Sequence, residues 1–160
     1  MIVKSCNLKK ILLVLLLVFC TTLTTGCGNK KAITTDDYKS KMESKDFTVQ
    51  DATSQFSNYE YVEQALIALE KSGSYQIEFY RLSDNDNAVS FFNNNKTTFE
   101  NSKSSGAVET SVSLGNNDKY TVTTNGQYKV VSRIDNTVVY LDVSDKYKSE
   151  VQKVLKDLGY

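Results

Sequence analysis

The C-terminal half of the chain contains four short runs in which apolar and polar residues alternate, and this pattern constrains the fold most strongly. The runs cover residues 108–114, 119–124, 127–134 and 137–143. Asn125-Gly126 and Asp135-Asn136 suit tight hairpin turns, because these residue types tolerate positive φ angles. Strands joined by such short connections lie antiparallel to one another. We therefore expect a four-strand antiparallel meander.

The preceding sequence alternates between helical and extended patterns. The expected helices cover residues 35–45, 59–71, 88–101 and a last segment that Ser144 caps and Gly159 ends; the expected strands cover residues 47–49 and 75–82. The 59–71 helix rests on Val62, Ala65, Leu66 and Leu69, which follow the spacing of one helical face. The sequence predicts an α+β fold: a mostly antiparallel sheet with helices packed on one face, in a single domain over residues 35–160.

The last hairpin has a definite predicted register. A two-residue loop at Asp135-Asn136 places Ile134 opposite Thr137, and it places Lys129 opposite Asp142 as a cross-strand ion pair. One face of the hairpin then carries a core set of six residues. These are Tyr128, Val130, Ile134, Val139, Leu141 and Val143.

The Asn125-Gly126 turn leaves two alternatives for the other face. A two-residue loop creates an outward patch with Tyr and Arg residues of the kind that interfaces favour. The candidate interaction surface comprises Tyr120, Val122, Val131, Tyr140, Lys129 and Arg133. A three-residue loop with Gly126 in a bulge instead turns Tyr120 and Val122 into the core. We favour the bulge, because it keeps more apolar area on the helix-covered face.

The N-terminal region carries an export pattern. Three lysines precede ten apolar residues at 11–20, followed by small and hydroxyl residues and then Gly26-Cys27. The apolar run is too short to span a bilayer, which takes roughly 20 residues. A short anchor or an ordinary secretory signal is the alternative, but a cysteine directly after Gly26 favours a lipid-modified product.

This segment resembles the signal peptide and lipobox of bacterial lipoproteins, with Thr24 where an aliphatic residue is usual and Leu23 one place earlier. The resemblance implies cleavage before Cys27 and a diacylglyceryl group on its thiol. Residues 1–26 are then the signal and residues 27–34 a lipidated tether. Two acyl chains hold a protein stably on a membrane, so we expect the domain on the outer face of the cell membrane. Lys30 and Lys31 either contact anionic headgroups or only keep the tether soluble.

Composition excludes several classes of chemistry. The chain has no His, and Cys27 is the last of its three cysteines. The domain therefore lacks the residues for Ser-His-Asp or Cys-His catalysis, disulfides and Cys- or His-ligated metals. The first 26 residues hold three of the 19 basic residues and none of the 19 acidic ones, so the remainder has a net charge of −3. No basic footprint for nucleic acid is present.

Acidic motifs receive plain structural interpretations. Residues 84–87 begin like a calcium loop, but Val89 and Asn95 stand where that loop needs Gly and Glu, so helix capping is the better explanation. Scattered carboxylates do not single out a glycosidase pair, and no Gly-rich phosphate loop occurs. The sequence predicts no metal and no cofactor.

Two segments, residues 79–100 and 133–160, resemble small lipoproteins of clostridia-like Gram-positive bacteria, and that resemblance implies a fold and a location but no activity. The expected function is a non-enzymatic, lipid-anchored module that binds a protein or envelope component. A small-ligand binding lipoprotein serving a transporter is the alternative. A third candidate is a carboxylate-based hydrolase of cell-wall glycans, which needs two facing acids.

Overall fold

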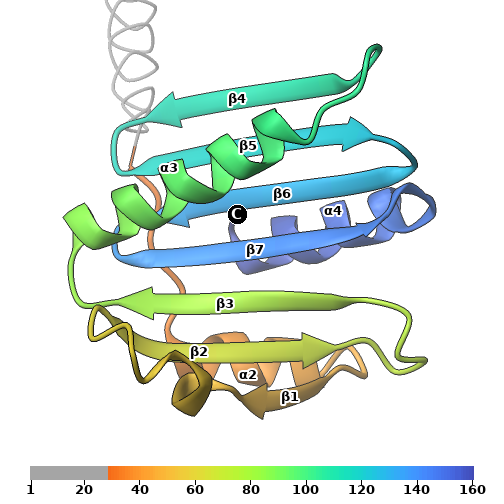
Figure 1. Cartoon of the computed structure of the whole chain (residues 1–160). Helices are drawn as coiled ribbons and strands as arrows, with labels where there is room; N and C mark the ends of the chain where they lie inside the picture. Colours follow the sequence, from red (N-terminus) through yellow and green to blue (C-terminus); the bar gives the residue numbers. More distant parts are fainter. Residues whose placement is uncertain (1–28) are drawn as a thin grey trace, which may run out of the picture.

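The computed structural model describes residues 29–160, so the export segment and Cys27 lie outside the described residues. Its centre is a seven-stranded sheet, ordered β1-β2-β3-β7-β6-β5-β4, in which every neighbouring pair is antiparallel (Figure 1). The strands are β1 Thr48–Asp51, β2 Val62–Leu69, β3 Gln76–Leu82, β4 Val108–Leu114, β5 Asn117–Thr124, β6 Gln127–Ile134 and β7 Thr137–Ser144. The helices are α2 Thr35–Glu43, α3 Asn85–Asn101 and α4 Lys148–Leu158, with 3-10 turns η1 Thr53–Phe56 and η2 Asp145–Tyr147. The α+β class is confirmed, and the predicted meander is one part of a larger sheet.

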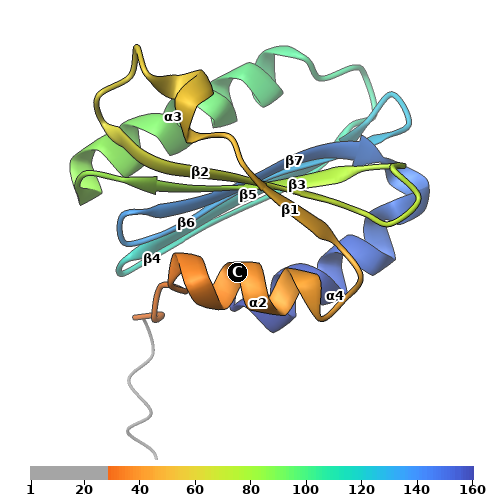
Figure 2. The ribbon, with the colours of Figure 1, turned by 90° about the horizontal axis from the view of Figure 1, so that it is seen from below.

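Helices cover both faces of the sheet, so the prediction of helices on one face is wrong. Figure 2 shows α3 on one side of the sheet and α2 with α4 on the other. Two separate cores result, one between the sheet and α2 with α4, the other between the sheet and α3. In the first core, the Tyr38 ring stacks on Phe79 at 4.7 Å between ring centroids, and the Tyr38 hydroxyl donates to the carbonyl of Ile77. Among residues 29–160, no helix combines the length and apolarity needed to cross a bilayer.

The second strand occupies a segment predicted to be a helix. Residues 59–71 form a loop and β2, whose Leu66 and Ala68 enter one core while Ala65 and Ile67 face the other. Because both faces are covered, this strand lacks the alternation that marks a half-exposed strand. Its continuous apolar run also matches a helical face, and local periodicity does not separate the two.

The meander has two-residue turns at both predicted hairpins. The register Ile134↔Thr137 and the Lys129–Asp142 ion pair, at 2.9 Å, confirm the last hairpin. At the other turn Thr124 pairs with Gln127, and Asn125 and Gly126 have φ angles of 51° and 72°. The predicted bulge is therefore wrong. The bulge was favoured in order to bury Tyr120 and Val122, but a second covered face buries them without it.

Capping residues set the helix boundaries largely as their chemistry predicts. Asp84 caps α3 by accepting from the Asn87 amide at 2.7 Å, and Gly159 ends α4 with a φ of 97°. Thr34 caps α2, because its hydroxyl oxygen accepts from the amide of Asp37 at 3.1 Å. Ser144 makes no side-chain capping bond, because a 3-10 turn separates it from α4.

The chain joins the domain earlier than the predicted tether allows. The backbone of Lys30 makes two hydrogen bonds to the Asn116 side chain, at 2.8 and 2.7 Å. Ile33 is buried in the core beside α2. Asn116 also donates to Asp135 at 2.8 Å, which ties the entering segment to the β4–β5 and β6–β7 turns. The segment from Lys30 onward is therefore part of the folded unit.

Candidate ligand-binding cleft

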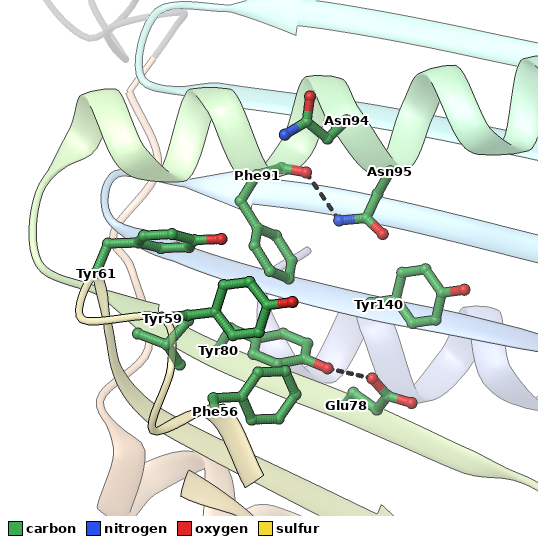
Figure 3. Close-up of a pocket in the computed structure, with 10 residues that line it drawn as sticks. Phe56, Tyr59, Tyr61, Glu78, Tyr80, Phe91, Asn94, Asn95 and Tyr140 are labelled. Carbon is green, nitrogen blue, oxygen red and sulfur yellow. Dashed lines mark hydrogen bonds between the residues drawn. The ribbon is translucent and has the colours of Figure 1, made fainter.

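An aromatic cleft of about 490 Å³ opens between α3 and the η1–β2 segment. Its floor is the strip of β3 and β7 that lies between these two elements (Figures 1 and 3). The lining residues are Phe56, Tyr59, Tyr61, Val62, Glu78, Tyr80, Phe91, Asn94, Asn95 and Tyr140. The volume falls within the range of small-molecule sites, which is roughly 300–1,000 Å³.

Backbone hydrogen bonds hold the loop that carries the rim of the cleft. The Ala65 amide of β2 donates to the Thr53 hydroxyl at 3.1 Å, which fixes η1 against the sheet. The amides of Tyr59 and Val62 close two successive turns, each bond being 2.8 Å long. The carbonyl of Tyr61 accepts from the Ser83 amide at the end of β3. The rim is therefore an ordered part of the fold.

Aromatic rings form a continuous wall in the cleft. Tyr80 lies between Phe56 and Phe91, with centroid distances of 5.4 and 4.8 Å. Tyr59 and Tyr61 contact each other at 5.8 Å on the rim. Tyr80 is 6% exposed, whereas Tyr59 and Tyr61 are 50% and 37% exposed. Two adjacent exposed tyrosines beside a hollow are typical of a binding surface.

Glu78 supplies the carboxylate at the floor of the cleft. It pairs in register with Tyr140 of β7. One carboxylate oxygen accepts from the Tyr80 hydroxyl and the other from Gln76 Nε2, at 2.8 Å. Glu78 forms no ion pair within residues 29–160. Figure 3 shows its carboxylate between the rings of Tyr80 and Tyr140.

Burial raises the pKa of two phenols in the cleft, those of Tyr80 and Tyr140. The pKa of Tyr80 is raised by burial first, then by its hydrogen bond to Glu78. Burial, followed by the charges of Asp142 and Glu78, raises the pKa of Tyr140 to about 12. Both hydroxyl groups therefore remain protonated at neutral pH and can donate hydrogen bonds.

The helix side of the cleft carries two amides. Asn95 Nδ2 donates to the carbonyl of Phe91 at 2.8 Å, which leaves its carbonyl oxygen available (Figure 3). The Asn94 side chain makes no hydrogen bond within the described part of the chain. The amides thus add donors and acceptors to an otherwise aromatic wall.

A second hollow, of about 530 Å³, shares Glu78 and Tyr140 with the cleft. Its lining comes from the β2–β3 loop and the neighbouring parts of β3, β6 and β7, and much of it is polar. The polar residues include Ser74, Gln76, Gln127, Asp142 and Ser144. Glu78 and Tyr140 therefore lie where an aromatic compartment meets a polar one.

Most of the predicted interaction surface is buried. Tyr120 is 1% exposed, and Val122 and Val131 are fully buried in the core beneath α3. The outward patch is the less favoured alternative, and it does not form at these three residues, because α3 covers the face on which they lie. Tyr120 and Val122 are buried, as the favoured alternative predicts, although the bulge that was to bury them is absent. The Tyr120 hydroxyl donates to Glu109 at 2.5 Å instead of facing a partner.

Of the other three predicted residues, two form ion pairs within the domain and one lines the cleft. Arg133 is 6% exposed and contacts Asp118 through both Nε and Nη2, each at 2.7 Å. Lys129 is engaged by Asp142. Tyr140 alone among the six lines the cleft, and its ring stacks on Phe99 at 5.2 Å.

Sequence reasoning missed the remaining cleft residues for identifiable reasons. Tyr59 and Tyr61 lie at the start of the predicted 59–71 helix, and Glu78 and Tyr80 lie within the predicted 75–82 strand, where no local pattern marks a site. The usable signal was the aromatic pair Tyr59 and Tyr61 directly before an apolar run, within a segment rich in turn residues.

The described residues contain no cluster of carboxylates suited to holding a metal ion. The cleft offers one carboxylate, Glu78, rather than the facing pair that glycoside hydrolysis uses. Its chemistry suits binding: ring faces, two amides, phenol donors and one negative charge.

No protein-family model and no curated protein matches this chain. Among solved structures, the chain is similar to the crystal structure of a GTP binding regulator from Thermotoga maritima. The two share 16% identity with a TM-score of 0.45, over 79% of this chain and 88% of that one. A similarity at this level carries no functional argument.

Proposed function

We propose that this protein is a lipid-anchored binding module on the outer face of the cell membrane, and that the aromatic cleft is its ligand site. The observation that carries the proposal is an ordered hollow with two exposed tyrosines and a carboxylate that has no cationic partner in the described chain. The lack of His throughout the sequence and the single cleft carboxylate support binding rather than catalysis.

The anchor half of the proposal rests on the lipobox-like sequence that ends in Gly26-Cys27. Lipidation of Cys27 adds two acyl chains, which are enough for stable attachment. Since Lys30 is already held by Asn116, only two residues separate the lipidated cysteine from the domain. Three residue steps reach at most about 11 Å. The anchored domain therefore rests close to the bilayer surface.

The short connection also orients the cleft. Asn116 contacts Asp135 in the β6–β7 turn, and the adjacent Asn136 donates to the Leu82 carbonyl at the end of β3. Tyr61 contacts that same end through Ser83. Lys30 and Tyr61 are thus both linked by hydrogen bonds to the same end of the sheet, which favours a ligand presented close to the membrane.

Two measurements test this proposal. Metabolic labelling with a clickable fatty acid is expected to mark the wild-type protein, and Cys27→Ala is expected to release the chain into the medium. A photo-crosslinking amino acid at Tyr59 is expected to capture an envelope component in intact cells, whereas the same group at exposed Val108, on the far edge strand, is not. An unlabelled protein refutes the anchor, and equal capture from both positions refutes the cleft.

The cleft volume also favours a second candidate, a small-ligand binding lipoprotein that serves a transporter. Ligand extracted from protein purified from its native membrane, and identified by mass spectrometry, distinguishes this role from capture of a protein partner.

A further inference from the structure

We infer that the cleft binds a ligand carrying an organic ammonium group, with Glu78 as the counter-charge and the rings of Tyr80, Phe91 and Tyr140 around the cation. This inference rests on the proposed function, since it names the chemistry of the ligand that the cleft accepts. Figure 3 shows the Glu78 carboxylate and these rings directed toward the same hollow.

The charge of the cleft favours a cation. Glu78 is the one charged residue that lines the cleft, and no Lys or Arg lines either the cleft or the adjoining hollow. Asp142, the other carboxylate of the adjoining hollow, is neutralised by Lys129 at 2.9 Å. The combined site therefore has a net negative charge centred on Glu78, which attracts cations and repels anions.

No lysine or arginine within residues 29–160 lies over a ring that lines the cleft. Lys96, Lys129, Lys146 and Lys148 lie over the rings of Tyr120, Phe99, Tyr147 and Tyr128, all of them outside the cleft lining. Neighbouring rings cover part of the faces of the cleft aromatics, with Phe99 stacked on Tyr140 and Tyr80 held between Phe56 and Phe91. The parts that remain open to the cleft can attract an incoming cation, at about 0.5–2 kcal/mol for each contact depending on desolvation.

A neutral ligand in the cleft would carry a desolvation cost. A neutral ligand that fills the cleft removes water from the Glu78 carboxylate without supplying a charge, and uncompensated burial of a charged group is unfavourable. Tyr80 and Gln76 each occupy one site on a carboxylate oxygen. Because an ionised carboxylate accepts about four hydrogen bonds, it keeps room for an ammonium donor.

Two kinds of ammonium satisfy this chemistry. A primary ammonium, such as a lysine side chain, donates hydrogen bonds to Glu78. A quaternary ammonium cannot donate and relies on its charge and on the ring faces. The two share one binding mode at the cleft floor, and they differ in their dependence on the carboxylate and on the rings.

The test uses the full-length lipidated protein in nonionic detergent, with ¹³C-labelled tyrosine rings observed by NMR. The probes are choline, its neutral isostere 3,3-dimethyl-1-butanol, the diamine cadaverine and N-acetylglucosamine. We expect choline or cadaverine to shift the cleft tyrosine signals saturably, and the neutral isostere to bind at least tenfold more weakly. Stronger binding of choline identifies a quaternary ammonium ligand, and stronger binding of cadaverine identifies a primary one.

Matched variants assign the charge effect. Glu78→Gln preserves shape and is expected to weaken cation binding about tenfold or more, with no change for the neutral isostere. Glu63→Gln is the control, because Glu63 is ion-paired to Arg81 and lies outside the cleft lining. Phe91→Leu removes a ring face while keeping apolar volume, so it tests the contribution of the rings to cation binding whether or not Glu78→Gln folds.

The inference is overturned if the neutral isostere binds as tightly as both choline and cadaverine, or if cation binding is weakened by neither Glu78→Gln nor Phe91→Leu. If N-acetylglucosamine alone shifts the cleft signals, the cation assignment is wrong while the cleft remains a binding site. Failure of all four probes also overturns the cation assignment. The proposed function is judged separately by crosslinking from Tyr59, which does not depend on ligand charge.

Discussion

Replacing Val131 by Ala tests whether α3 truly covers its face of the sheet. Val131 is fully buried in the core beneath α3. The substitution removes two buried carbons, worth about 1.6 kcal/mol at ~0.8 kcal/mol each. Incomplete relaxation around the resulting cavity raises the expected loss of unfolding free energy to about 2–3 kcal/mol.

Val112→Ala is the matched control, because Val112 is also a strand valine but is 46% exposed on edge strand β4. Its expected effect is within about 0.5 kcal/mol. Urea unfolding followed by circular dichroism measures both variants, and equal slopes in denaturant confirm that the same transition is compared. If both variants lose equally little stability, the face beneath α3 is open and the two-core description fails.

Three further predictions concern a buried ion pair, a phenol and the entry segment. Arg133→Ala should cost about 3 kcal/mol in denaturant unfolding, because it leaves the largely buried Asp118 unpaired; a loss below 1 kcal/mol contradicts this. Tyr140 has its pKa raised to about 12 when folded against about 10 when unfolded, so its contribution to stability is complete below pH 10 and is lost as the pH rises toward 12. Tyr140→Phe should therefore flatten the alkaline decline of the melting temperature, and an unchanged profile argues against it. Asn116→Ala removes two bonds to the Lys30 backbone and should cost about 1 kcal/mol, with faster proteolysis near Lys30; an unchanged cleavage rate contradicts the short connection.

The cleft lies between the two elements that cover this face of the sheet, which is why it keeps a carboxylate and a half-buried tyrosine outside the core. α3 packs over β5, β6 and β7 through Ala88, Phe92 and Phe99, while η1 packs beside β2. The strip of β3 and β7 between them keeps one polar residue, Glu78, and one half-buried tyrosine, Tyr140. The hollow is thus a gap between two covering elements, and its lining comes from four segments distant in sequence.

Local residue patterns predicted the elements whose signals are self-contained. The Asp135-Asn136 turn, the alternation of β6 and β7, the Asp84 cap and the Gly159 stop each depend on residues within a few positions of one another. Backbone sterics and hydrogen bonding at these sites are the same in a peptide as in the folded protein. Composition alone likewise excluded thiol and imidazole chemistry from the domain.

Tertiary packing decided the remaining features. Whether Tyr120 and Val122 face water or a core depends on α3 crossing their face, which no local pattern records. Residues 62–69 have the apolar spacing of a helical face but form a strand, because both faces of the sheet are covered there. The cleft also depends on long-range contact, since Tyr59, Glu78, Phe91 and Tyr140 meet only when strands far apart in sequence pair. Short-range sterics act along the chain, whereas burial is shared between segments. The sequence by itself therefore determined the turns, the caps and most of the elements, and the tertiary structure decided that residues 62–69 form a strand and where the cleft lies.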